Sequence, residues 1–353
     1  MATPFALDAD FEECLKANGL EEFVGGPPFP PGDIDQRRER LKNLSSRRPR
    51  PTVDTSGVDI SDHYTSSEDG HRVLLRWYRP RSAAVNGSHT ATSPTTTTTT
   101  TRTTTTATTK PAVIYIHGGG LICSTIDDYD VLVASLVSMT RTPFLAVEYR
   151  LAPEHRYPAA LHDVYAALAW LHARAHDLHV DQTRIAIMGS SAGAGLGAAT
   201  AILARRRGGG LSIAKQIFTA PMIDCRNVRP HDPRLAPLLS WNHLDNATGW
   251  SSYLGQEVLD GHEEGDGIPD TASPSRLDSA EGMPPLYLEV GSLDIFVQEG
   301  IEYASKHVRA GVPVELHVYP GLPHSYDSLA GQCQLARMAK AHRVRTITSL
   351  RGE

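Results

Sequence analysis

The chain has few cysteines and no long hydrophobic run. Its 353 residues include four cysteines that are far apart and form no CxxC pair: Cys14, Cys123, Cys225 and Cys333. Their scarcity argues against a disulfide framework and indicates reduced thiols. The longest apolar stretch, residues 192–204, is too short to cross a bilayer and fits a buried helix better. We therefore expect no transmembrane segment.

Basic clusters and export signals are also scarce. The net charge is -6, and the nearest approach to a basic stripe is "RRPRP" at 47–51, so we expect no nucleic-acid partner. The first 20 residues lack the basic and apolar regions of a secretory signal, which predicts a cytoplasmic protein. The glycosylation sequons at Asn43, Asn86 and Asn246 are then attributed to chance.

Three segments lack regular strand and helix patterns. The Thr-rich tract at 89–109 has no apolar periodicity, so we expect a disordered surface loop. Residues 226–283 are polar, irregular and too long for an ordinary connection, which suggests a lid or cap. The first 55 residues begin with helix-like spacing around Phe11 and Leu15, but the charged stretch at 35–51 is expected to be irregular and exposed.

Between these segments, strand and helix patterns alternate. Apolar strand-like runs fall at 71–80, 112–117, 142–149, 183–189, 214–223, 284–292 and 314–320, and helical patterns at 129–139, 160–178, 191–207 and 301–311. Nearly continuous apolar strands between amphipathic helices predict an α/β fold with a mostly parallel sheet covered on both faces. Ligands bind such sheets at the carboxyl ends of the strands.

The stretch "MGSSAGAG" contains a G-x-S-x-G pattern at residues 189–193. An apolar strand enters it and a small-residue helix leaves it, which is the context of a strained turn that exposes a nucleophilic serine, here Ser191. A phosphate-binding loop is the alternative, but its Lys-Ser/Thr pair is absent. The pattern therefore predicts Ser191 as a nucleophile.

The stretch "HGGG" at 117–120 ends a buried strand with three glycines. Serine acyl transfer needs N–H donors aimed at a developing oxyanion, and glycine lets the backbone come close enough to donate. We therefore predict Gly119, Gly120 and Ala192 as oxyanion-hole donors. His117 is expected to order this loop through hydrogen bonds, with a catalytic base or a metal ligand as the alternative reading.

An acid and a histidine should follow the nucleophile in the chain, each at the end of a strand. Asp294 follows the strand at 284–292, and His324 follows the strand at 314–320. We predict that Asp294 orients His324 and that His324 deprotonates the serine. Asp224 is the rival acid because it follows the preceding strand, whereas His317 lies within a strand and is expected to be structural.

Metal and cofactor motifs are missing. His172 and His176 lie one helical turn apart, but no H-E-x-x-H glutamate and no evident third ligand accompany them, so a solvent-facing pair is expected. No dinucleotide fingerprint appears where one would be needed. We expect chemistry without a metal or cofactor.

Taken in order, "HGGG", "EYRLAPEHRYPAAL", "GSSAG", "GSLD" and "GLPH" resemble the hormone-sensitive-lipase-like branch of the α/β-hydrolase superfamily. The resemblance covers residues 71–330. It implies an α/β-hydrolase core at 56–353, carboxylic-ester hydrolysis through an acyl-enzyme, and a cap made from residues 1–55 and the 226–283 insertion. "YRLAPE" would be mainly structural. The chain departs from the family pattern at three positions: Ser190 replaces a common Asp, Ala194 a common Gly, and Leu121 a common aromatic residue.

The resemblance leaves the exact activity open. A serine esterase for short or medium acyl esters, a lactone or a secondary metabolite is expected. An acyltransferase could use the same triad, and the plant gibberellin receptors of this fold bind a hormone after losing the catalytic histidine, whereas this chain retains His324. The aromatic residues Trp241, Trp250 and Tyr253 either line the substrate pocket or form the core of the cap.

Overall fold

A computed structural model describes four parts of the chain, residues 5–49, 53–81, 109–255 and 267–352. Except for Thr109, the expected Thr-rich loop lies outside the described residues, as do residues 256–266 of the expected insertion. Among the described residues, no helix is both long and apolar enough to cross a bilayer.

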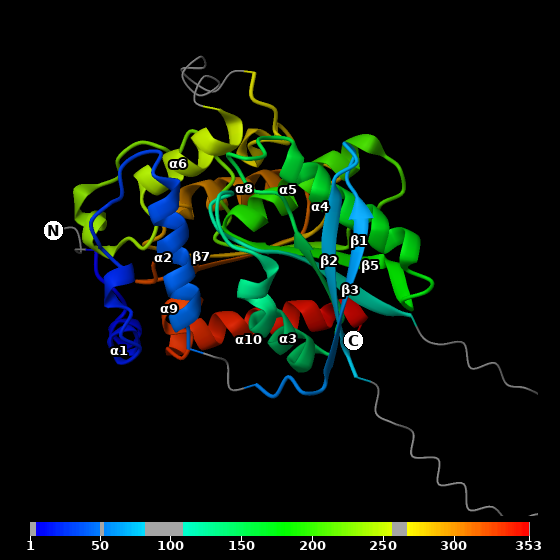
Figure 1. The fold of residues 1–353 in the computed structure, drawn as a ribbon, viewed down its shortest axis with the longest axis horizontal. Helices are drawn as coiled ribbons and strands as arrows, with labels where there is room; N and C mark the ends of the chain where they lie inside the picture. Colours follow the sequence, from blue (N-terminus) through cyan, green and yellow to red (C-terminus); the bar gives the residue numbers. More distant parts are fainter. Residues whose placement is uncertain (1–4, 50–52, 82–108, 256–266, 353) are drawn as a thin grey trace, which may run out of the picture.

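The described residues form one eight-stranded sheet (Figure 1). Its strands are β1 (Val58–Ser66), β2 (Arg72–Pro80), β3 (Lys110–Ile116), β4 (Phe144–Glu148), β5 (Val180–Ser190), β6 (Lys215–Thr219), β7 (Leu286–Gly291) and β8 (Val314–Tyr319). In space the order is β1-β2-β4-β3-β5-β6-β7-β8. The pairs β1–β2 and β2–β4 are antiparallel, and the remaining pairs are parallel. The predicted α/β fold with a mostly parallel sheet is confirmed.

Helices cover both faces of this sheet. The helices of the described residues, not all of which contact the sheet, are α1 (Ala9–Ala17), α2 (Ile34–Arg47), α3 (Asp130–Thr140), α4 (Ala159–Arg174), α5 (Ala192–Arg207), α6 (His243–Leu254), α8 (Val297–Arg309), α9 (Tyr326–Ala330) and α10 (Gln334–Thr348). In Figure 1, α4, α5 and α8 lie above the sheet, and α3 and α10 lie below it.

Strand alternation explains the two layers, because successive side chains of a strand point to opposite faces. Along β3, Ile114 and Ile116 join the hydrophobic cluster that includes α4 and α5, whereas Val113 and Tyr115 join the cluster that includes α3. Both faces of the strand are therefore buried, as its continuous apolar sequence indicates.

The N-terminal region differs from one expectation. Helix α1 buries Phe11 and Leu15, as their spacing suggests. The charged stretch that follows is not irregular but forms α2, in which the Asp33 side chain accepts a hydrogen bond from the Gln36 N–H at 3.1 Å and caps the first turn. Arg37 of α2 is only 2% exposed. The expectation of an irregular segment was wrong, whereas exposure holds for residues such as Glu39 and Lys42 but not for Arg37, whose charge a distant carboxylate compensates.

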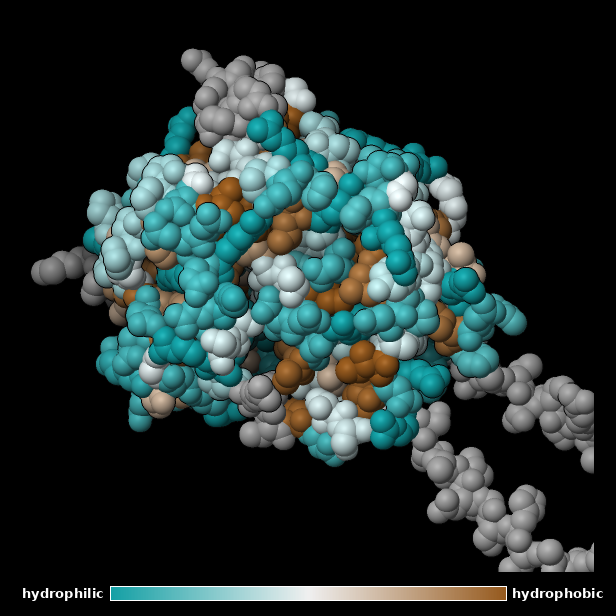
Figure 2. Space-filling view, in the orientation of Figure 1, coloured by the Kyte–Doolittle hydropathy of each residue, from teal (hydrophilic) through white to brown (hydrophobic). Residues whose placement is uncertain are grey.

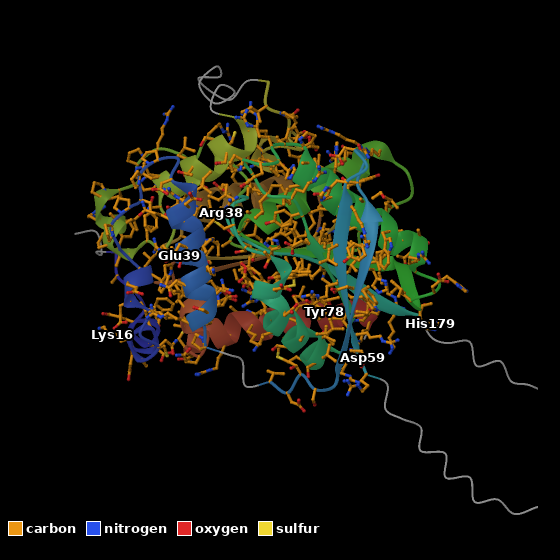
Figure 3. The ribbon with its side chains drawn as sticks, viewed as in Figure 1. Lys16, Arg38, Glu39, Asp59, Tyr78 and His179 are labelled. Carbon is orange, nitrogen blue, oxygen red and sulfur yellow. The ribbon has the colours of Figure 1, made fainter. Side chains whose placement is uncertain are left out.

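That carboxylate belongs to Asp245 of α6, whose Oδ1 lies 2.9 Å from Arg37 Nε. The next residue of α2 is Arg38, which Figure 3 labels. It donates to the carbonyl oxygen of Ile122 at 2.8 Å and forms an ion pair with Glu154. Polar contacts therefore attach α2 both to α6 and to the loop that follows β3. The division into a cap and a core stays a prediction.

The face shown in Figure 2 is mostly hydrophilic, and its hydrophobic residues form small separate patches. Large apolar side chains that are exposed elsewhere in the described chain include Val308 of α8 and Val318 of β8. Scattered apolar residues of this kind are normal on a protein surface and carry no function by themselves.

Candidate active site

Ser191 stands at a sharp turn between β5 and α5. Its φ of 54° lies in the left-handed region, which is unusual for a residue with a side chain and costs free energy that the surroundings must offset. The Ser191 N–H donates to the Thr219 carbonyl at 2.9 Å, and the Met222 N–H donates to the Ser191 carbonyl at 3.1 Å. These bonds hold the strained backbone in place.

The glycines on either side of this serine are required by close packing. A Cβ at Gly189 would lie 2.5 Å from the carbonyl carbon of Gly193, and a Cβ at Gly193 would lie 2.2 Å from the carbonyl oxygen of Ile116. Real Cβ atoms do not approach backbone so closely. The G-x-S-x-G pattern therefore reflects the contact between β3, β5 and the start of α5.

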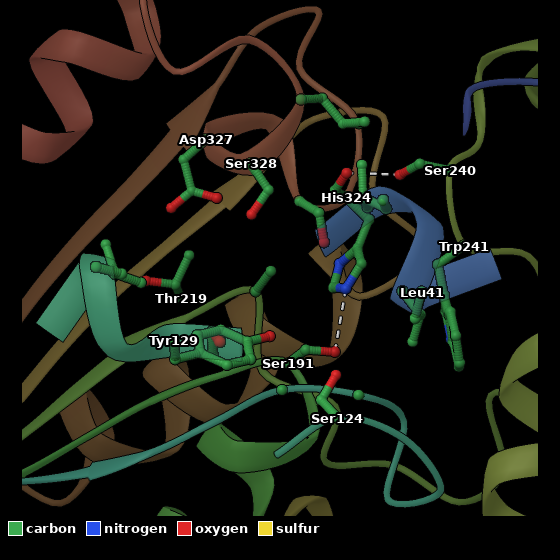
Figure 4. A pocket seen from close by; sticks show the side chains of 18 of the residues that line it. Leu41, Ser124, Tyr129, Ser191, Thr219, Ser240, Trp241, His324, Asp327 and Ser328 are labelled. Carbon is green, nitrogen blue, oxygen red and sulfur yellow. Dashed lines mark hydrogen bonds between the residues drawn. The ribbon is translucent and has the colours of Figure 1, made fainter. Parts of the chain in front are cut away.

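Ser191, His324 and Asp294 lie in one hydrogen-bonded row, of which Figure 4 shows the bond between Ser191 and His324. His324 Nε2 is 3.0 Å from Ser191 Oγ, and His324 Nδ1 is 2.6 Å from Asp294 Oδ2. The loops after β7 and β8 bring the acid and the histidine to the carboxyl edge of the sheet. Because a carboxylate only accepts, the row assigns the ring proton to Nδ1 and leaves Nε2 as the acceptor for the serine hydroxyl.

The histidine is held on several sides. The Ser240 hydroxyl donates to the His324 carbonyl at 2.5 Å, and the ring of Phe296 packs edge-on with centroids 5.0 Å apart. Asp294 Oδ1 accepts from the Phe296 N–H at 3.0 Å, which fixes the second oxygen of the acid. All three members of the row are less than 9% exposed. The ring therefore has one well-defined orientation.

The rival acid has a different partner. The Asp224 carboxylate forms an ion pair with Arg226, two residues later, at 2.8 Å. The hydrogen bonds of His324 go to Asp294 and Ser191 instead. The structure thus places Asp294, and not Asp224, beside the histidine.

The three predicted donors lie around the same serine. Gly119 has a φ of 133° and Gly120 a φ of 60°, conformations that favour glycine. A Cβ at Gly120 would lie 2.4 Å from the Trp241 ring. Within the described residues, no hydrogen bond occupies the N–H groups of Gly119, Gly120 or Ala192. These amides therefore have no acceptor within the described chain, and their role as oxyanion donors stays a prediction.

His117 lies behind the glycines, 1% exposed, and its ring stacks on Tyr149 with centroids 4.2 Å apart. Its Nδ1 is 2.8 Å from the Gly118 carbonyl, and the Tyr149 hydroxyl donates to the His117 carbonyl at 2.9 Å. Burial lowers the pKa of His117 from 6.5 to about 4. A neutral ring of this kind stabilises the loop, in keeping with the role expected from the sequence.

The other histidines lie away from the row. The expected solvent-facing pair was wrong for His172, which is buried and whose Nε2 bonds to the Ser212 carbonyl at 3.0 Å, whereas His176 is exposed. His317 bonds to Glu315 at 2.7 Å and stacks on His342. Within the part of the chain that the structure describes, no three His, Cys, Asp or Glu side chains group closely enough to hold a metal ion.

A pocket surrounds Ser191 and His324, and distant segments contribute to its wall. Trp241 lines it, whereas Trp250 and Tyr253 are buried outside it. The three aromatic residues therefore divide between the two roles considered from the sequence.

The sequence reasoning missed the contribution of α2 to the pocket. Leu41 and Leu44 both line it, and Figure 4 draws Leu41 beside Trp241. Their spacing with Arg37 and Arg48, three or four residues at each step, is helical and was the available signal.

Comparisons with known proteins agree with this geometry. A family model described as the alpha/beta hydrolase fold matches residues 113–328. Esterase LipI of Mycobacterium tuberculosis is 33% identical over 223 residues, which are 63% of this chain and 67% of that protein. Carboxylic ester hydrolase LipN of the same organism is 30% identical over 322 residues, covering 88% and 77% of the two chains.

Solved structures of similar proteins have the same fold as this chain. A bacterial heroin esterase superposes with a TM-score of 0.78 and 28% identity, covering 98% of both chains. These relatives are named as esterases or ester hydrolases, which agrees with the enzyme class that the motifs predict. Since the family model spans more than half of the sequence, this chain belongs to the hormone-sensitive-lipase-like branch of the α/β-hydrolase family.

Proposed function

We propose that the protein hydrolyses carboxylic esters through a Ser191–His324–Asp294 triad. The observation that carries the proposal is the row of hydrogen bonds, 3.0 Å from His324 to Ser191 and 2.6 Å from His324 to Asp294. Both distances lie in the range that a nucleophile, its general base and an orienting acid need. The esterase names of the relatives support the same chemistry.

In the first step, Ser191 Oγ attacks the carbonyl carbon of the ester while His324 Nε2 takes the serine proton. The Asp294 carboxylate stabilises the resulting imidazolium and keeps the ring oriented. The negative charge on the former carbonyl oxygen is stabilised by the free N–H groups of Gly119, Gly120 and Ala192. The amino end of α5 points at the same place and adds its dipole.

The second half of the reaction returns the enzyme to its starting state. His324 gives its proton to the leaving alkoxide as the carbon–oxygen bond breaks, which leaves an acyl group on Ser191. A water molecule then attacks the acyl carbon, again losing its proton to His324. Collapse of this intermediate releases the carboxylic acid, and the proton goes back to the serine oxygen.

The same proposal assigns two segments as a cap. Residues of α2 and Trp241 of the 226–283 insertion line the pocket over Ser191. The substrates proposed are short or medium acyl esters, including lactones and secondary metabolites.

The test combines a fluorophosphonate probe with hydrolysis of p-nitrophenyl butyrate. We expect labelling and turnover by the native chain, and loss of both in Ser191→Ala. A native chain that is not labelled would favour a binding protein. Labelling without hydrolysis, with acyl transfer to an added alcohol, would favour a transferase. Either result would overturn the hydrolase assignment.

A further inference from the structure

The pocket continues beyond Ser191 into a recess lined by polar side chains. We call this part the polar recess, and its members come from five separate places in the chain: Tyr115, Tyr129, Arg48, Asp327 and Arg343. They line the same pocket as the serine, so a substrate bound at Ser191 can extend into the recess. The triad and the oxyanion donors use none of them.

Cations outnumber anions along the wall of the pocket, although the whole chain carries a net charge of -6. Its lining contains three arginines and one carboxylate. Arg343 is compensated, because its Nη1 lies 2.8 Å from Asp327 and its Nε 3.1 Å from Glu289. Arg40 and Arg48 form no ion pair with a carboxylate among the described residues. Asp327 and the neighbouring Glu289 balance the charges of Arg343 and Arg48, but both carboxylates pair with Arg343, so within the described chain Arg48 is left without an ion-pair partner.

Three buried donors in the recess form no hydrogen bond within the described part of the chain: Arg48 Nε, the Tyr115 hydroxyl and Arg343 Nε. Arg343 Nε still faces a carboxylate, 3.1 Å from Glu289, whereas Arg48 has no ion pair. Tyr115 is 2% exposed, and burial raises its pKa, so its hydroxyl stays protonated. The Arg48 guanidinium lies 5.2 Å from the centre of the Tyr129 ring, within cation–π distance. Buried donors normally have partners, and unpaired ones require an explanation.

We propose that the polar recess binds a carboxylate carried by the ester substrate, with Arg48 as the ion-pair partner and Tyr115 as a neutral donor. The proposal rests on the hydrolase function above and adds the chemical class of the substrate. A carboxylate suits the recess because it accepts several hydrogen bonds and pairs well with a guanidinium. The carboxylate in the pocket lining, Asp327, has its ion pair with Arg343 and none with Arg48 in the described chain.

Matched substrates test the proposal and show on which side of the ester the carboxylate lies. Methyl valerate and monomethyl glutarate differ in a carboxylate on the acyl side, and butyl acetate and 4-acetoxybutyrate differ in one on the alcohol side. Hydrolysis is followed by pH-stat with the full chain. We expect kcat/KM to be at least about tenfold higher for the charged member of one pair, the usual size of one charge-assisted hydrogen bond.

Three variants test whether Arg48 causes the preference for the charged ester. We expect Arg48→Gln to remove it and Arg48→Lys to restore part of it. The control is Arg47→Gln, which alters the preceding residue, an arginine paired with Glu22 and outside the pocket lining, and should leave the preference intact. An equal loss for charged and neutral esters in Arg48→Gln would indicate a structural role and overturn the proposal. So would a native enzyme with no preference in either pair.

Binding separates this proposal from the proposed function. If the native chain hydrolyses none of these esters and resists the fluorophosphonate, the hydrolase assignment fails. Calorimetry with glutarate on the native chain still tests whether the polar recess binds a carboxylate. Binding that weakens about tenfold in Arg48→Gln would support it, and absence of binding to the native chain would overturn it.

Discussion

Asp294 and Asp224 occupy comparable positions in the fold, yet their carboxylates have different partners. Each follows a parallel strand at the carboxyl edge of the sheet, and the two strands, β7 and β6, are neighbours. Asp294 bonds to His324, whereas Asp224 bonds to Arg226 two residues later. The strand determines where each carboxylate lies, and the adjoining loop determines what it meets.

The largest predicted effect separates these two acids. Asp294→Asn should lower kcat for p-nitrophenyl butyrate about 10⁴-fold, because an amide at this position stabilises the wrong tautomer of the histidine. Asp224→Asn is the matched control and should change kcat by less than about threefold, because the ion-pair partner of Asp224 is the half-exposed Arg226 and not His324. Circular dichroism checks that both variants fold. Equal losses of kcat in the two variants would mean that Asp294 is no more important for the reaction than Asp224.

The same contrast applies to two regions of the molecule. One is the carboxyl edge of the sheet, and the other, here called the cover, consists of α2 and the 226–283 insertion. The sheet edge follows from local sequence: an apolar run predicts a strand, and Ser191, Asp294 and His324 are found just after such runs. The cover depends on contacts between distant residues. Arg37 and Asp245 are separated by 208 positions, and both look like solvent-facing charges when each is read alone. Their pairing could not be predicted from periodicity, and without it α2 was expected to be exposed.

The pocket wall shows the same limit. Leu41 and Leu44 follow helical spacing, so that a helix with an apolar stripe was predictable in principle. What that stripe packs against was not, because one sequence contains no information on which distant surface completes it. The partner of Asp224, by contrast, was within reach of local reasoning, since Arg226 is two residues away.

The second prediction tests whether the cover depends on its buried ion pair. Arg37→Met should lower the free energy of unfolding by about 3 kcal/mol, because it leaves the Asp245 carboxylate buried without its cation. Urea unfolding measures the loss. In the control Arg47→Met, the ion pair is exposed on both sides and the loss should stay below about 1 kcal/mol. Similar losses in both variants would show that burial of the pair is unimportant.

The third prediction concerns the support behind the oxyanion loop and uses pH. His117 has an ordinary pKa of 6.5 when unfolded and about 4 when buried in the folded chain. Its contribution to stability is therefore complete above pH 6.5 and is lost as the pH falls towards 4. Between pH 7 and pH 5 this loss amounts to about 2 kcal/mol.

The matched variant for this measurement is His117→Phe, which keeps a ring for stacking on Tyr149 but cannot take up a proton. Urea unfolding of both proteins at pH 7 and pH 5 gives two declines in stability. We expect the decline to be steeper in the native chain, whatever the difference between the proteins at pH 7. Parallel declines would mean that His117 does not titrate between these pH values.

The smallest predicted effect lies where the two regions meet. Ser240 belongs to the insertion, and its hydroxyl donates to the carbonyl of His324 at the sheet edge. Ser240→Ala should lower kcat about threefold with little change in KM, because one neutral hydrogen bond contributes about 1 kcal/mol and here helps to position the base. Ser240→Thr keeps a hydroxyl and should recover most of the rate. If KM changes while kcat does not, Ser240 shapes the pocket instead of positioning His324, and the catalytic row is independent of its cover.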